Sequence, residues 1–230
     1  MSDYLYGKNS FIEALHSDRI KKAYVLKDSG FIDDLKRRHI EYEIVDRRYL
    51  DKMSKSGNHQ GVLAEVKDYK LYNLEDMIKK ENGLIVVLDG LKDPHNLGAI
   101  IRTCECAGVD GIIYKKHNSV KLNDTVAKVA CGALEYVKVS EVTNLTNTLK
   151  KLKDEGYWIV GSDGSATTSY KDVDYKRNIV LVVGSEGEGI SRLVLEECDY
   201  VVSLPMKGNV NSLNASVAAG ILIYNIINSR

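Results

Sequence analysis

The feature that most constrains the fold is a series of short apolar runs, rich in valine and isoleucine, that alternate with amphipathic stretches from residue 84 onward. Uninterrupted apolar runs of this length are typical of parallel strands buried on both faces, and strands that alternate with helices indicate an α/β fold. The predicted strands are residues 84–88, 111–114, 136–139, 158–161, 179–183 and 200–204, and the predicted helices include residues 96–107 and 212–228.

The first 66 residues predict a smaller, separate α/β unit. Helices are expected near residues 9–15 and 31–38, strands at residues 23–26, 42–45 and 62–66, and a further short helix before the last strand. The polar and aromatic stretch that follows has no strong period and indicates a linker. We therefore predict a first domain over residues 1–68, a linker over 69–80 and a second domain over 81–230.

Composition limits the function only broadly. No apolar run approaches the ~20 residues that a membrane helix needs, and the first residues lack the basic-then-apolar order of a signal peptide, so we expect a soluble, cytosolic protein. The formal net charge is zero and gives no sign of a nucleic-acid partner. The four cysteines fit none of the paired zinc spacings, so we interpret them as reduced, mostly core residues and expect no metal site.

Three segments differ from ordinary α/β connections, and each follows a predicted strand, where open α/β sheets bind their ligands. The first, residues 88–103, combines a strand end, a polar loop and the start of a helix. The apolar side chains of that helix share one face, which leaves Asn96 near its N-terminus and directs Arg102 away from the apolar face. Taken alone, Asn96 is more readily explained as a helix cap and Arg102 as a solvated charge.

The second segment, residues 183–190, holds three glycines in six residues after the most hydrophobic strand. Glycine lets the backbone approach a ligand closely or adopt positive φ. The order G-x-x-G-x-G is the reverse of the dinucleotide fingerprint, so a nucleotide-binding Rossmann site fits poorly. Glu186 is either a plain surface carboxylate or a hydrogen-bond acceptor that fixes a neighbouring loop.

The third segment, residues 204–216, is a loop that runs into the last predicted helix. Asn211 or Ser212 can cap that helix, and its N-terminus supplies free backbone N–H groups with partial positive charge. A capped helix without any ligand explains the same residues equally well.

In this order and spacing, the three segments resemble the motifs of the SpoU branch of the SPOUT methyltransferase superfamily. Asn96 with Arg102 resembles the first motif, residues 184–189 the second and residues 212–216 the third. One motif alone is weak evidence, whereas the ordered set is highly specific. The resemblance implies an RNA 2′-O-ribose methyltransferase that uses S-adenosylmethionine. It also implies that the parallel sheet ends in a trefoil knot, an exception to the unknotted topology of most proteins.

The N-terminal unit carries a second resemblance. Residues 6–15 and 59–62 are similar to the RNA-binding extension of the 23S rRNA guanosine 2′-O-methyltransferases, which has an L30e-like fold. This similarity favours a guanosine of 23S rRNA as the substrate over transfer RNA. For His59, the sequence favours neither of two interpretations, an RNA contact or a structural loop histidine. The candidate RNA contacts are Lys8, Arg37, Arg38 and His59.

The family resemblance also implies a cofactor site and a dimer. The cofactor is expected in the knot, and family members are homodimers whose terminal helix contributes to the interface. Small residues in that helix would permit close helix approach. The candidate cofactor contacts are Gly184, Gly189, Leu204, Met206 and Leu213, and the small residues are Ala215, Ser216, Ala218, Ala219 and Gly220.

The implied catalytic residues are Arg102, Asn96, Glu186, Ser212 and Asn214. We expect Arg102 to anchor the phosphate beside the target ribose and to stabilise the developing alkoxide. Proton removal by Arg102 is the more demanding role, because a guanidinium normally keeps its proton. The two asparagines and Ser212 would orient the hydroxyl and the loops, and Glu186 would hold that network.

Three alternatives remain open at this point. The chain could be a transfer RNA or resistance-type ribosomal methyltransferase with the same loop chemistry. It could be a non-catalytic RNA-binding or ribosome-assembly protein on the same scaffold, although the joint presence of the five catalytic candidates argues against this. A dinucleotide-dependent oxidoreductase is disfavoured, because the early strand of the second domain lacks G-x-G-x-x-G.

Overall fold

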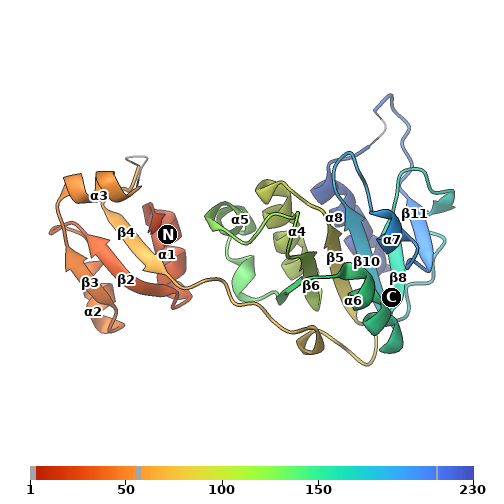
Figure 1. The fold of residues 1–230 in the computed structure, drawn as a ribbon, viewed down its shortest axis with the longest axis horizontal. Coiled ribbons are helices and arrows are strands. Elements are labelled where there is room, and N and C mark those ends of the chain that lie inside the picture. Colours follow the sequence, from red (N-terminus) through yellow and green to blue (C-terminus); the bar gives the residue numbers. More distant parts are fainter. Residues whose placement is uncertain (1–3, 55–57, 211) are drawn as a thin grey trace. The chain divides into compact units, whose positions relative to one another are not determined.

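The computed structural model describes residues 4–54, 58–210 and 212–230. They divide into two compact units on either side of the junction between Tyr69 and Lys70 (Figure 1). Each unit is described by itself. Within the described residues, no helix combines the length and the apolar character needed to cross a membrane.

The first unit is a four-stranded mixed sheet between helices, with strand order β1-β4-β2-β3. Side chains of the central strand β4 (Val62–Val66) alternate between the two faces of the sheet: Val62 and Ala64 pack on one face, and Leu63 packs on the other. The first two helices cover the Val62 face and the third covers the Leu63 face. The elements are β1 (Tyr4–Tyr6), α1 (Lys8–His16), β2 (Ile20–Val25), α2 (Ile32–Arg37), β3 (Glu41–Ile44), α3 (Arg47–Ser54) and β4 (Val62–Val66).

The second unit is built on a seven-stranded sheet with the order β7-β6-β5-β10-β8-β11-β9, and every pair in it is parallel. This sheet confirms the predicted α/β class. The strands are β5 (Leu84–Asp89), β6 (Gly111–Lys115), β7 (Val139–Val142), β8 (Trp158–Ser162), β9 (Thr168–Ser169), β10 (Ile179–Gly184) and β11 (Tyr200–Ser203).

Helices cover both faces of this sheet (Figure 1), which is why its strands are apolar without interruption. In β5, Val86 faces a core shared with α4, α5 and α8, whereas Val87 faces a core shared with α6 and α7. All six residues of β5 are buried. The helices are α4 (Pro94–Cys106), α5 (Asp124–Ala130), α6 (Leu145–Asp154), α7 (Arg192–Leu195) and α8 (Ala215–Asn228).

Strand β10 lies between β5 and β8, and it pairs with both over almost its whole length. The sheet is parallel, so the loops that follow β5, β10, β8 and β11 all leave from one edge of the sheet. Three of these loops are the segments that the sequence singles out. The fold thus gathers the candidate residues of distant segments at one place.

Three predicted element boundaries are wrong, and the short strands β1 and β9 were not predicted. Strand β2 begins at Ile20, three residues before its predicted start. The strand predicted at residues 136–139 is β7 at Val139–Val142, because a short 3-10 turn over Ala133–Glu135 leads into Tyr136, whose side chain is 79% exposed. The last helix begins at Ala215, and its N-cap is Asn214 instead of Ser212. The other cap candidate, Asn211, lies outside the described residues.

The four cysteines are free thiols. Cys104 is buried in the core on one face of the sheet, and the partly buried Cys198 packs against the core on the other face. Cys106 and Cys131 are exposed. The expectation of mostly core cysteines therefore holds for two of the four.

Candidate functional site

Three loops meet at one carboxylate. Glu186, in the turn after β10, accepts three hydrogen bonds on its Oε1 atom: from Asn96 Nδ2 at 2.9 Å, from Asn214 Nδ2 at 2.8 Å and from the backbone N–H of Ala215 at 3.3 Å. These four residues are called the Glu186 junction below. A carboxylate that accepts several N–H groups is a strong tether because its hydrogen bonds are charge-assisted. The junction therefore fixes the start of α4 and the start of α8 to the same turn.

Asn96 reaches Glu186 because another residue caps its helix. The carboxylate of Asp93 accepts a hydrogen bond from the backbone N–H of His95 at 3.0 Å, and Pro94 occupies the first helical position, where its missing N–H costs nothing. The side chain of Asn96 is thereby released from a capping role. Asn96 is 4% exposed, so its amide needs an internal partner, and Glu186 supplies it.

Asn214 both caps its helix and donates a hydrogen bond to Glu186. Its Oδ1 accepts from the backbone N–H groups of Ser216 and Val217, which caps α8, while its Nδ2 donates to Glu186. One side chain therefore joins the helix N-terminus to the turn after β10 and orients both.

The turn after β10 is narrow. Ser185 and Gly189 exchange two backbone hydrogen bonds of 3.0 Å, and Gly187 and Gly189 have φ values of +90° and +69°, which favour glycine. The buried carboxylate of Asp89, at the end of β5, accepts from the backbone N–H of Ser191 at 2.7 Å. The turn is therefore held on both sides of its tip.

Gly184 is required by packing within this turn. A Cβ atom there would overlap the backbone of Gly189 and Ile190. We expect Gly184→Ala to destabilise the fold by about 1–3 kcal/mol, as for other overpacking substitutions. The measurement is thermal unfolding of the purified variant.

Gly208→Ala is the matched control for that substitution, because a Cβ at Gly208 meets no atom within 4 Å and its φ is unexceptional. We expect the control to unfold at nearly the wild-type temperature. Equal stability of the two variants would show that the turn opens to make room for a side chain.

Among the described residues, Arg102 makes no hydrogen bond or ion pair with the Glu186 junction of its own chain. It is exposed on α4, and its Nη1 atom donates to the Cys131 sulfur over 3.6 Å, at the end of α5. Within the part of the chain that the structure describes, its guanidinium has no carboxylate partner. Its charge is therefore available to an external anion.

The remaining candidates lie on the loop between β11 and α8. Leu204 is partly buried against the core, whereas Met206, Ser212 and Leu213 are exposed. This loop begins at the end of β11 and reaches the turn after β10 through the hydrogen bond from Asn214 to Glu186. Because β8, β10 and β11 are parallel, Leu204 leaves the sheet at the same edge as Gly184. Neither of the two cavities at this edge, described below, is lined by any of the five cofactor candidates, Gly184, Gly189, Leu204, Met206 and Leu213.

The sequence analysis did not single out Asp163. It follows β8, next to β10 in the sheet, and its Oδ2 atom lies near Gly189. Hydrogen bonds from the hydroxyl and the backbone N–H of Ser165 hold the pKa of Asp163 below its usual value. Its Asp-Gly-Ser turn after a strand is the signal that could have found it.

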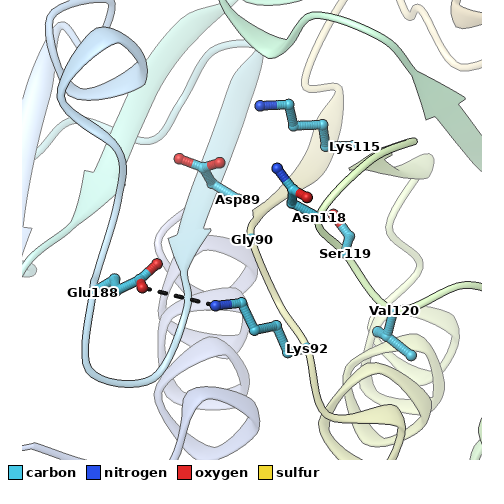
Figure 2. Close-up of a pocket in the computed structure, with 8 residues that line it drawn as sticks. All are labelled: Asp89, Gly90, Lys92, Lys115, Asn118, Ser119, Val120 and Glu188. Carbon is cyan, nitrogen blue, oxygen red and sulfur yellow. Dashed lines mark ion pairs between the residues drawn. The ribbon is translucent and has the colours of Figure 1, made fainter.

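Two neighbouring cavities open at this edge of the sheet. The smaller, of about 180 Å³, is lined by Asn96, Ser185 and Glu186, among others. The larger, of about 490 Å³, lies between the loops after β5 and β6 (Figure 2). Lys92 and Glu188 line both cavities and form an ion pair of 3.7 Å, drawn as a dashed line in Figure 2.

The candidate RNA contacts of the first unit differ in their surroundings. His59 is 2% exposed; its Nε2 contacts Asp51 at 3.0 Å and its Nδ1 accepts from the backbone N–H of Gly61, which favours the structural alternative for this histidine. Arg37 is paired with an aspartate, as is Arg38. Lys8 has an exposed side chain, and its backbone N–H donates to the Gln60 side chain at 2.8 Å, which caps α1.

Two family models match the chain. Residues 83–224 match the SpoU rRNA Methylase family, and residues 4–72 match a model described as RNA 2′-O ribose methyltransferase substrate binding. Together they span nearly the whole chain.

Relatives and solved structures agree with these matches. A Bacillus subtilis protein assigned to the TrmH family of tRNA/rRNA methyltransferases is 43% identical over 240 aligned positions, which cover 99% of this chain and 96% of that protein. An AdoMet-bound rRNA methyltransferase from Sinorhizobium meliloti superposes with a TM-score of 0.80 at 23% identity, over 97% of this chain and 85% of that one. A TrmH/SpoU tRNA modifying enzyme from A. aeolicus is 34% identical with a TM-score of 0.60, over 68% of this chain and 79% of that one.

Proposed function

The chain belongs to the SpoU rRNA methylase family, and from this we propose that it methylates the ribose 2′-hydroxyl of an RNA nucleotide with S-adenosylmethionine. The observation that carries the proposal is the Glu186 junction, because it joins the three segments that resemble the family motifs. A non-catalytic protein on the same fold would not need a buried asparagine and the N-cap residue of a helix to donate hydrogen bonds to one carboxylate.

We propose that the cofactor binds in the space beside the turn after β10. The positive-φ glycines of this turn bring bare backbone close to that space, and the exposed apolar side chains of Met206 and Leu213 would be covered by an adenosyl group. Asp163 offers an ionised acceptor at the same edge. When bound, S-adenosylmethionine supplies a methyl group on a positively charged sulfur.

The reaction sets two requirements for the substrate. The 2′-oxygen must attack the methyl carbon in line with the bond that breaks, and it must lose its proton as it attacks. We assign Asn96 and Asn214 to holding the hydroxyl and loops in that geometry, with Ser212 beside them, while Glu186 holds the two asparagines. Arg102 binds the phosphate next to the target ribose and stabilises the developing alkoxide.

We propose that the active site is completed in a homodimer. Among the described residues, Arg102 has no hydrogen bond or ion pair to the Glu186 junction of its own chain, and α4 packs directly against α8. The outer face of α8 exposes Val217, Ile221 and Tyr224, at 50%, 40% and 44%, which lie on one helical face. Of the small residues expected to permit helix approach, Ala215 and Ala219 instead face their own core.

We expect Ile221→Asp to convert the protein to a monomer, because a charge in the middle of an apolar interface must be desolvated. Light scattering coupled to gel filtration measures the mass in solution. Lys151→Asp, on an exposed position of α6, is the control that should leave the dimer intact. A wild-type protein that already runs at 25.7 kDa would end the dimer proposal.

The N-terminal unit supports ribosomal RNA as the substrate. The rRNA methyltransferase structure covers 97% of this chain, whereas the tRNA modifying enzyme covers 68%. We propose that residues 1–68 bind RNA, with Lys8 as the foremost contact, that residues 69–80 act as a linker and that residues 81–230 carry the chemistry in a knotted sheet. The proposed target is a guanosine of 23S rRNA.

The test is incubation of the protein with labelled S-adenosylmethionine and total RNA from a strain that lacks it. We expect label in 23S rRNA, in a dinucleotide that resists alkaline hydrolysis because its 2′-oxygen is methylated. Label in transfer RNA would overturn the choice of substrate. The absence of label from every RNA would overturn the proposed function.

A further inference from the structure

The cavity of about 490 Å³ between the loops after β5 and β6 has no role in the chemistry assigned so far. Its volume falls within the ~300–1,000 Å³ of small-molecule sites. It is lined by Asp89, Gly90, Lys92, Lys115, Asn118, Ser119, Val120 and Glu188. It is therefore a polar site with charges of both signs.

Three of its polar side chains lack a partner within the described residues. The Ser119 hydroxyl is buried and makes no hydrogen bond, although buried polar atoms are nearly always paired. The half-buried Lys115 and the exposed side chain of Asn118 have no hydrogen bond or ion pair there either. The Ser119 hydroxyl is inaccessible to solvent, so the groups that a ligand can reach are the Lys115 ammonium and the Asn118 amide. A half-buried ammonium without a partner at the wall of a cavity indicates a polar ligand.

The walls of the cavity are fixed to the methyl-transfer site. The backbone N–H of Val120 donates to the carbonyl of Leu91 at 2.8 Å, which ties the loop after β6 to the loop after β5. On the other side, Lys92 and Glu188 separate this cavity from the smaller one at Asn96 and Glu186. Their ion pair is exposed, with side chains 68% and 79% accessible, so it costs little to displace.

We propose that this cavity receives the unstacked base of the target nucleotide, while the ribose of the same nucleotide lies at the Glu186 junction. The inference rests on the proposed function. RNA enzymes commonly act on unpaired nucleotides whose bases are splayed out and read along their edges. Two adjacent cavities that share a displaceable wall match a nucleotide divided into a sugar and a base.

The lining favours guanine among the four bases. Asp89 has one oxygen engaged with Ser191, and its carboxylate faces the cavity as a hydrogen-bond acceptor. Lys115 and Asn118 lie around the same space and offer donors (Figure 2). Guanine offers adjacent N–H donors on one edge and the O6 and N7 acceptors on another. Every base carries donors and acceptors, but guanine alone has two adjacent N–H donors for a carboxylate, beside an O6 acceptor for a lysine.

The experiment measures binding of the four nucleoside 5′-monophosphates to the full-length protein by saturation-transfer NMR. We expect guanosine monophosphate to bind most tightly of the four. We expect Lys115→Gln to weaken its binding about 10-fold or more, because one charge-assisted hydrogen bond is lost. The matched control is Lys116→Gln, which removes the same charge from the next residue, where the ammonium lies 3.9 Å from Glu141. The control should bind like the wild type.

Equal binding of the four nucleotides, or equal weakening by the two lysine variants, would overturn the assignment of the cavity. The same variants are then assayed for methyl transfer to the RNA identified with the wild type. A lower kcat/KM for Lys115→Gln alone supports the base site. Guanosine monophosphate binding that depends on Lys115 in a protein that methylates no RNA would instead refute the proposed function and leave the base site standing.

Discussion

Replacing Arg102 with alanine is expected to lower methyl transfer about 10²–10³-fold, the effect of removing one donor to a developing oxyanion. The side chain is exposed, has no carboxylate partner among the described residues and donates a hydrogen bond to the Cys131 thiol, so its removal should leave the fold intact. Calorimetry should then give an unchanged affinity for S-adenosylmethionine. Single-turnover assays with the identified RNA measure the loss.

Two further variants decide how Arg102 acts. Lys128→Ala removes a positive charge from the neighbouring helix α5, and we expect nearly full activity from it. Arg102→Lys keeps the charge but loses the planar fork that binds a phosphate with two hydrogen bonds, so it should recover only part of the rate. Full activity of Arg102→Ala would remove the proposed role.

Replacing Glu186 with alanine is expected to loosen two loops at once. The buried amide of Asn96 loses its acceptor, and Asn214 is released from the turn after β10. A buried donor without a partner costs about 1–3 kcal/mol, which lowers Tm by several degrees in a protein of this size. Because the released loops also border the proposed cofactor site, S-adenosylmethionine affinity and turnover should fall together.

Glu186→Gln separates the hydrogen bonds from the charge. Glutamine keeps an acceptor oxygen at the same distance, so we expect Tm to return most of the way while turnover recovers less. Glu196→Ala is the control, because this glutamate is the C-cap residue of α7 and, among the described residues, its ion pair is with the exposed Arg192. A Glu186→Ala protein with wild-type Tm and activity would show that the junction does not support the site.

The sequence predicted the strands of the second unit well because burial on both faces leaves apolar runs that no other element of this length explains. The boundary at Tyr136 was missed because Tyr-Val-Lys-Val alternates like a strand, while the turn before it has no strong local signal. The cap of α8 was misplaced because asparagine and serine, which have the same capping chemistry, recur over residues 209–216. Tertiary contact with Glu186 decides between them.

The candidate site was predictable only in part. The order of the motifs named Asn96, Glu186 and Asn214, and the structure joins these three, but nothing in the sequence shows that one carboxylate oxygen accepts all their hydrogen bonds. The large cavity was not foreseen, because Asn118 and Ser119 read as ordinary loop residues. Their lack of partners is visible only after the loop after β6 is docked on Leu91.

The central place of β10 has a consequence for how the protein is made. On a growing chain, β5, β6 and β7 are synthesised first, and β8 follows, yet β5 and β8 are joined only when residues 179–184 insert between them. Until then, the partial sheet of β5, β6 and β7 and the unpaired strand β8 present apolar edges that can pair with other molecules. Substitutions that weaken β10 should therefore reduce the yield of soluble protein in cells more than they reduce the stability of the molecules that fold, and chaperones should have their greatest effect in this interval.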